Sequence, residues 1–110
     1  MRSLFLAAAL ILATAQLGAP AALAQTSPAM EEYKAAMTKM HASAPTMSSG
    51  DVDIDFVRMM IPHHQAAIDM AKTQLKYGKN PELRKLAQDI IAAQEKEITE
   101  MNVWLKKNGK

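Results

Sequence analysis

The 110-residue sequence contains no cysteine, so neither a disulfide nor a thiolate ligand is available to it. Small exported domains often depend on disulfides, and closed structural zinc sites usually include thiolates, so both of these solutions are excluded. The soft or borderline metal ligands that remain are thioether sulfur and imidazole nitrogen. The chain has nine methionines and three histidines to supply them.

Concentrated charge and strand-like alternation are also missing. Lysine and arginine number 13, aspartate and glutamate 11, and the two signs are interspersed along the chain. A nucleic-acid-binding surface needs a concentrated basic face, so no nucleic-acid partner is predicted. No segment alternates apolar and polar residues as a half-buried strand does, and no internal repeat or low-complexity tract occurs. The fold class predicted is therefore all-α.

The sequence has no uninterrupted apolar run long enough to cross a bilayer, which takes ~20 residues. The longest, residues 4–12, follows Arg2 and precedes the small-residue boundary Ala22-Leu23-Ala24. This three-part form predicts a secretory signal peptide over residues 1–24, whereas the alternative is a membrane anchor. The expected product is a single small domain, residues 25–110, that is periplasmic or secreted and has no membrane segment.

Capping signals predict a helix at each end of this domain. Ser27-Pro28 combines a serine N-cap with proline at the first helical position, and the helix ends before Pro45. Asn80-Pro81 repeats that signal for a helix that ends at Asn108-Gly109.

A third helix is predicted between these two, from the acidic residues at 51–55 to Tyr77. Pro62 lies inside it and cannot donate a hydrogen bond to the carbonyl group of Arg58. A kink is expected there, and a break into two helices is the alternative. Three helices with short connections form a short antiparallel bundle.

The stretch "MMIPHHQAAIDM" in the middle helix carries two adjacent histidines among methionines. At 100° per residue, His63, Met60 and His64 lie about 40°, 100° and 140° from Met59, and Met70 lies at about 20°. The opposite side of the helix is polar and carries Arg58, Gln65, Asp69, Lys72 and Lys76. The spacing therefore predicts that both imidazoles point into the apolar side.

The other two helices offer partners for these rings. The first helix has Met37, Met40 and His41 on its inward face, and the third has Gln94 and Glu97 among its core residues. A buried amide and a buried carboxylate need hydrogen-bond partners, and an inward histidine has a ring nitrogen to offer. Gln94 and Glu97 are therefore candidates for orienting metal-bound histidines.

Methionine alone does not indicate a metal site, because it also fills irregular gaps in hydrophobic cores. Two inward histidines near several thioethers do, since packing alone needs no imidazole and each buried ring costs desolvation energy. Thioether and imidazole together suit Cu(I) and, by the same softness, Ag(I), and the histidines make Cu(II) conceivable. A di-iron carboxylate centre needs paired Glu-x-x-His motifs, and none occurs.

The segments "MIPHHQAAIDMA" and "IIAAQEKEITEMNVWL" are specific, and through them residues 54–105 resemble domain-of-unknown-function family 305, a group of bacterial exported proteins. The resemblance implies a ferritin-like helical bundle, and some members look like periplasmic copper- or silver-binding proteins linked to metal tolerance. The positions that match the family pattern are Met60, His63, His64, Met70, Gln94, Glu97 and Met101. Met37, Met40 and His41 lie outside the firm match. The chain is shorter than many members and carries one His-His motif, so a homodimer that completes the bundle is a candidate assembly.

The predicted function is a periplasmic copper buffer or chaperone, not an enzyme, with metal ions as its partners. The predicted metal ligands are His63, His64, Met60, Met59, Met70, Met101, His41, Met37 and Met40. Two alternatives stay open. One is an enzyme that uses His63 or His64 as acid or base, oriented by Glu97; the other is an interaction module with a methionine-rich face for a partner helix.

Overall fold

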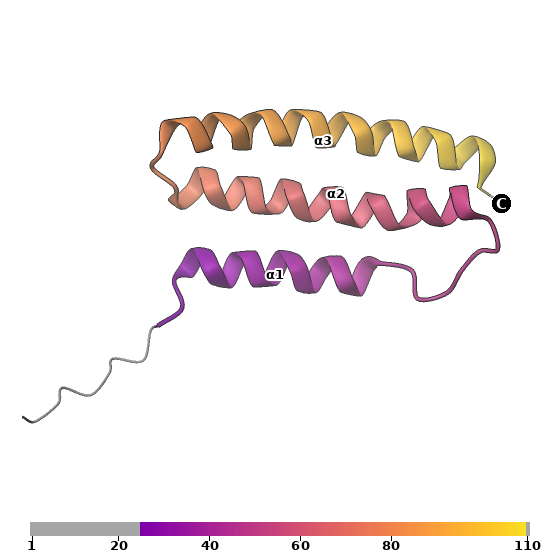
Figure 1. Ribbon diagram of the computed structural model, residues 1–110, viewed down its shortest axis with the longest axis horizontal. Helices are drawn as coiled ribbons and strands as arrows, with labels where there is room; N and C mark the ends of the chain where they lie inside the picture. The colour runs from indigo at the N-terminus through magenta and orange to yellow at the C-terminus, as the bar shows by residue number, and fades with distance from the viewer. Residues whose placement is uncertain (1–24, 110) are drawn as a thin grey trace, which may run out of the picture.

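The computed structural model describes residues 25–109, which form three helices and contain no strand. They are α1 (Pro28–Ser43), α2 (Val52–Tyr77) and α3 (Pro81–Asn108), each antiparallel to the next (Figure 1). The predicted all-α antiparallel bundle of three helices is confirmed. The predicted signal peptide, residues 1–24, lies outside the described residues, and its cleavage stays a prediction.

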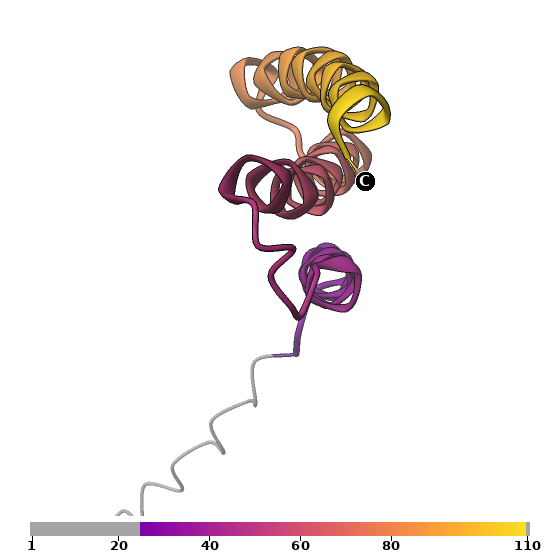
Figure 2. The ribbon, with the colours of Figure 1, turned by 90° about the vertical axis from the view of Figure 1, so that its right-hand side faces the viewer.

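α2 occupies the middle of the molecule. It packs against both other helices, whereas within residues 25–109 no Cα atom of α1 lies within 8 Å of a Cα atom of α3. The view along the helices shows α1 and α3 on opposite sides of α2 (Figure 2). The three helices therefore form a single layer, so two sides of α2 lie against neighbours and two lie on the faces of the layer.

The helix starts follow the predicted capping residues. The Ser27 hydroxyl accepts a hydrogen bond from the backbone N–H of Met30 at 3.1 Å, and the Asn80 side chain accepts one from Leu83 at 3.0 Å. The carboxylate of Asp51 accepts from the second and third backbone N–H groups of α2. Each contact satisfies donors that have no partner within the helix, which explains why the helices begin where they do.

α2 is one continuous helix across Pro62, so the alternative of two separate helices is wrong. Pro62 is buried, as is Ala66 one turn later, and both border a small cavity with Met40 and Ala36 of α1. The proline thus sits where α1 packs on α2, and this contact helps the helix tolerate the backbone hydrogen bond that Pro62 does not make.

Glu32 of α1 ties the two helices together near the end of α2. Its carboxylate accepts hydrogen bonds from Lys76 at 2.5 Å, Tyr77 at 2.8 Å and Thr73 at 3.2 Å. The bonds from Lys76 and Tyr77 lower the pKa of the Glu32 carboxyl below its ordinary value of 4.5. The same carboxylate raises the pKa of Lys76. The shifts agree in direction, as expected for one ion pair.

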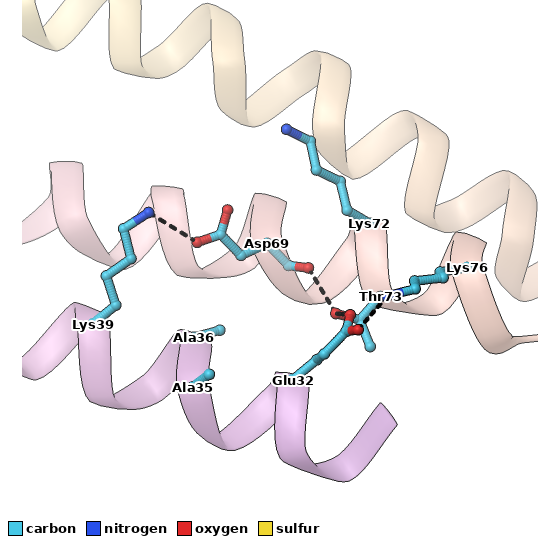
Figure 3. Close-up of a pocket in the computed structure, with 8 residues that line it drawn as sticks. All are labelled: Glu32, Ala35, Ala36, Lys39, Asp69, Lys72, Thr73 and Lys76. Carbon is cyan, nitrogen blue, oxygen red and sulfur yellow. Dashed lines mark hydrogen bonds and ion pairs between the residues drawn. The ribbon is translucent and has the colours of Figure 1, made fainter. Parts of the chain in front are cut away.

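One face of the layer is polar. Charged side chains of α1 and α2 line a shallow groove there, and the Lys39 ammonium lies 3.6 Å from a carboxylate oxygen of Asp69 (Figure 3). Small residues, including the buried Ala36, form the floor of the groove. This side corresponds to the polar arc that the helical spacing of α2 predicts.

The opposite face of the layer is largely apolar, with acidic residues at one end, and no described helix packs over it. Large side chains of α2 and α3 are between about a third and two thirds exposed on it, although α3 buries only Ala87 completely. Two grooves between α2 and α3 run along this side, and Tyr33 of α1 also borders one of them. We call it the open face and define it by Phe56, Met59, His63, Met70, Leu83 and Leu86.

Candidate metal-binding site

His64 is a buried histidine that links α2 to α3. Its side chain is 9% exposed, its Nδ1 lies 2.9 Å from the carbonyl oxygen of Met60, and its Nε2 contacts the carboxylate of Glu97 on α3. The contact between Glu97 and an inward histidine ring agrees with the expectation from the sequence. The ring is therefore held at both nitrogens, one within its own helix and one across the interface.

Both partners of the His64 ring are hydrogen-bond acceptors. They are the carbonyl oxygen of Met60 and a carboxylate oxygen of Glu97. A metal ion that binds either ring nitrogen must therefore replace one of these two contacts.

A hollow of about 650 Å³ lies between α2 and α3 beside this ring. Met60 and His64 line it from α2, and Met101 and Glu97 line it from α3. Phe56 and Trp104 also border it, and their rings were not predicted as part of a site. The structure thus brings two thioethers and one imidazole to a single hollow, with a carboxylate in contact with the imidazole.

His63 does not follow the prediction that both rings face inward. It is exposed, and its ring centroid lies 6.2 Å from that of His64, with the ring planes at 60°. The physical reason is the layered packing: α1 and α3 cover the two flanks of α2, and no described helix covers the arc between them that carries His63. Apolar periodicity predicts which side of α2 is apolar, but part of that side faces outward in the structure.

Met59 and Met70 share the exposed arc with His63. They are 48% and 37% exposed. Met59 lies one turn before His63, but Met70 lies seven residues after it, which is about 10 Å along the helix. One chain therefore does not place all three side chains around one point.

The candidate ligands of α1 lie away from the hollow. Met37 and His41 are exposed, and Met40 borders the small cavity beside Pro62 instead. Because α1 contacts only α2, the described structure does not bring these three residues to His64.

Gln94 is placed differently from Glu97, although both were expected to orient ligands. Its side-chain oxygen is buried and accepts no hydrogen bond within the described part of the chain. It therefore makes no contact of the kind that links Glu97 to His64.

Within residues 25–109, no three histidine, aspartate or glutamate side chains are placed to hold a metal ion together. No helix in this range combines the length and apolar composition needed to cross a membrane. The hollow between α2 and α3 is instead lined by donors of mixed type, the side chains of Met60, His64, Glu97 and Met101.

Comparison with known proteins finds one family model that matches most of the chain. The family model described as "Domain of unknown function (DUF305)" matches residues 13–105. A viral relative, "Uncharacterized protein L153" of Acanthamoeba polyphaga mimivirus, is 46% identical over 50 residues, covering 46% of this chain and 33% of that protein. The match thus spans about a third of that relative's length.

Proposed function

Because the chain belongs to the DUF305 family, we propose that it is an exported protein that binds Cu(I), and by the same chemistry Ag(I), as a buffer or chaperone. The observation that carries the proposal is the meeting of Met60, His64 and Met101 in one hollow between α2 and α3. Thioether and imidazole donors favour soft monovalent ions over zinc, calcium or magnesium.

Each donor has a defined part in the proposed site. The sulfurs of Met60 and Met101 supply neutral ligands that need no deprotonation, so they hold the ion even in mildly acidic surroundings. His64 supplies Nδ1, which gives up its contact with the Met60 carbonyl oxygen, while Nε2 stays against Glu97. Glu97 thereby positions the ring and provides a negative charge close to the bound cation.

The position of the hollow suits transfer of an ion better than catalysis. In the single chain Glu97 is half-exposed and the hollow is open to solvent, so an ion can enter and leave without unfolding the helices. Exported proteins meet oxidising conditions that convert thiols to disulfides or sulfenic acids, and a thiol-free site avoids this chemistry.

An anaerobic Cu(I) titration against a colorimetric chelator tests the proposal on residues 25–110. We expect Met60→Leu and Met101→Leu each to weaken Cu(I) binding about tenfold, or ~1.4 kcal/mol, because leucine keeps the packing volume and removes the sulfur. His64→Ala should weaken it at least as much. Met47→Leu is the matched control, since Met47 is 84% exposed and lies in the loop before α2.

Equal affinities for the wild type, the two leucine variants and His64→Ala would remove the hollow as the site. Weaker binding by Met47→Leu to the same extent would show that the effect is not local.

A further inference from the structure

The exposed arc of α2 carries three soft or borderline donors, but a single chain cannot bring all three to one metal ion. Met59, His63 and Met70 lie within about 40° of one another around the helix, and all three are exposed. Met59 and His63 are one turn apart and can share a ligand. Met70, about 10 Å further along, cannot join them within the same chain.

The arrangement of these donors is symmetric about the middle of α2. Met59 lies seven residues after the first residue of the helix, Val52, and Met70 lies seven residues before the last, Tyr77. A second α2 laid antiparallel across the first, midpoint on midpoint, therefore places each Met59 opposite the Met70 of the other copy. Such a self-complementary pattern is what a two-fold interface requires.

We propose that two copies of this chain pair through their open faces. In the pair, Met59 and His63 of one copy and the Met70 of the other form a shared Cu(I) or Ag(I) site. Two such sites arise by symmetry, separate from the hollow at His64. The inference rests on the proposed soft-metal function but not on the hollow as the location of binding.

The size of the open face supports a second copy as its occupant. α2 and α3 have 26 and 28 residues, so each is about 40 Å long, and side by side they present roughly 800 Å². That is the area per partner of a standard stable interface, ~800 Å². Phe56, Leu83 and Leu86, all at least half exposed in the single chain, would be covered.

Charge favours the antiparallel arrangement in particular. Asp53, Glu97 and Glu100 line the groove at one end of the open face, and the groove at the other end has no charged lining residue. An antiparallel copy lays the acidic end of one chain over the uncharged end of the other. A parallel copy would instead lay acid over acid, which is unfavourable.

The mass of residues 25–110 in solution tests the pairing, measured by sedimentation or light scattering with and without Ag(I), which resists redox change. We expect Ag(I) to shift the protein to the dimer mass. Leu86→Glu should stay a monomer, whereas Gln88→Glu, which adds the same charge at an exposed position of α3, should behave as the wild type. Circular dichroism would check that both variants remain helical.

A mixing experiment tests the shared site itself. All chains in it carry Met60→Leu and Met101→Leu, which disable the hollow. One test variant adds Met59→Leu/His63→Ala and the other adds Met70→Leu; each removes part of every shared site, so each variant alone should lose tight Ag(I) binding. In a mixed dimer one of the two sites is whole. An equimolar mixture should therefore recover about a quarter of the shared sites if the chains pair at random. Mixing Met59→Leu/His63→Ala with Met59→Leu is the control and should recover none.

The outcomes separate the two proposals. A wild type that binds Ag(I) but stays a monomer, or a mixed dimer that recovers no binding, overturns the shared site and leaves the proposed function standing. A chain that binds neither Cu(I) nor Ag(I) overturns both, whatever its mass.

Discussion

At the scale of single residues, His64 contributes to the stability of the fold and is also a ligand in the proposed metal site. A buried imidazole costs desolvation energy, and the two hydrogen-bond partners at its nitrogens offset that cost. One of them, Glu97, has a half-exposed side chain, so its contribution to stability is screened by solvent. In the proposed site its larger part is to orient the ring. Which of two adjacent histidines is buried could not be predicted, because both fall on the apolar side of the helical wheel.

Replacing Glu97 tests this division of roles. Glu97→Ala should lower Cu(I) affinity about tenfold or more, the usual effect of removing a residue that orients a metal-bound histidine. The free energy of unfolding should fall by less than about 1 kcal/mol because Glu97, one partner of the pair, is half-exposed. Chelator competition and urea denaturation give the two values.

Glu100→Ala is the control for that variant, since Glu100 lines the same hollow without contacting His64. If both variants weakened Cu(I) binding equally, only the negative charge of the hollow would matter, and the orienting role of Glu97 would be refuted.

At the scale of helices, the order and limits of the elements could be predicted well. Ser27, Asp51 and Asn80 cap the helices as their residue types indicate, because capping depends on neighbours within three residues. The contacts between helices could not be predicted in the same way. Glu32 meets residues 41 to 45 positions away, and this depends on how far α1 slides along α2, which no local pattern determines.

The contact at Glu32 predicts a pH dependence for the docking of α1. The folded-state pKa of Glu32 is lowered, so the carboxylate stabilises the docked helix above its ordinary pKa of 4.5. That stabilisation is lost as the pH falls below 4.5 and through the lowered pKa. Backbone hydrogen exchange in α1 should therefore become less protected relative to α2 on acidification.

Glu32→Gln should remove most of this dependence, because the amide does not titrate in that range. Glu31→Gln is a weaker match but a useful control: Glu31 also has a lowered pKa, yet its hydrogen bonds are to Thr26 and Lys34 near its own helix and not to α2. An α1 whose exchange responds to acid in the same way in wild type and Glu32→Gln would contradict the proposed contact.

At the scale of the whole molecule, the layer explains why the sequence predicts a bundle correctly and still misplaces His63. The apolar arc of α2 is wider than the flanks that α1 and α3 cover, so part of it remains on the open face. Periodicity along a chain reveals how much apolar surface a helix presents, but not whether the same chain covers it. The proposed pairing of two copies would return His63, Met59 and Met70 to an interior, where the sequence analysis expected the histidine.

The same geometry divides the predicted ligands into groups. Met60, His64 and Met101 share the hollow, and Met59, His63 and Met70 share the exposed arc. The residues of α1 join neither group in the described structure. The sequence does not separate these groups, since helical spacing does not distinguish the side of α2 that faces α3 from the arc beside it.

The most direct test of the metal-binding proposal is the X-ray absorption spectrum of the Leu86→Glu chain loaded with one equivalent of Cu(I), because this variant isolates the hollow from any paired site. The account predicts sulfur and nitrogen neighbours around copper, with the sulfur signal strongly reduced once Met60→Leu and Met101→Leu are added. A spectrum with only nitrogen and oxygen neighbours, or a sulfur signal unchanged by those two substitutions, would contradict it.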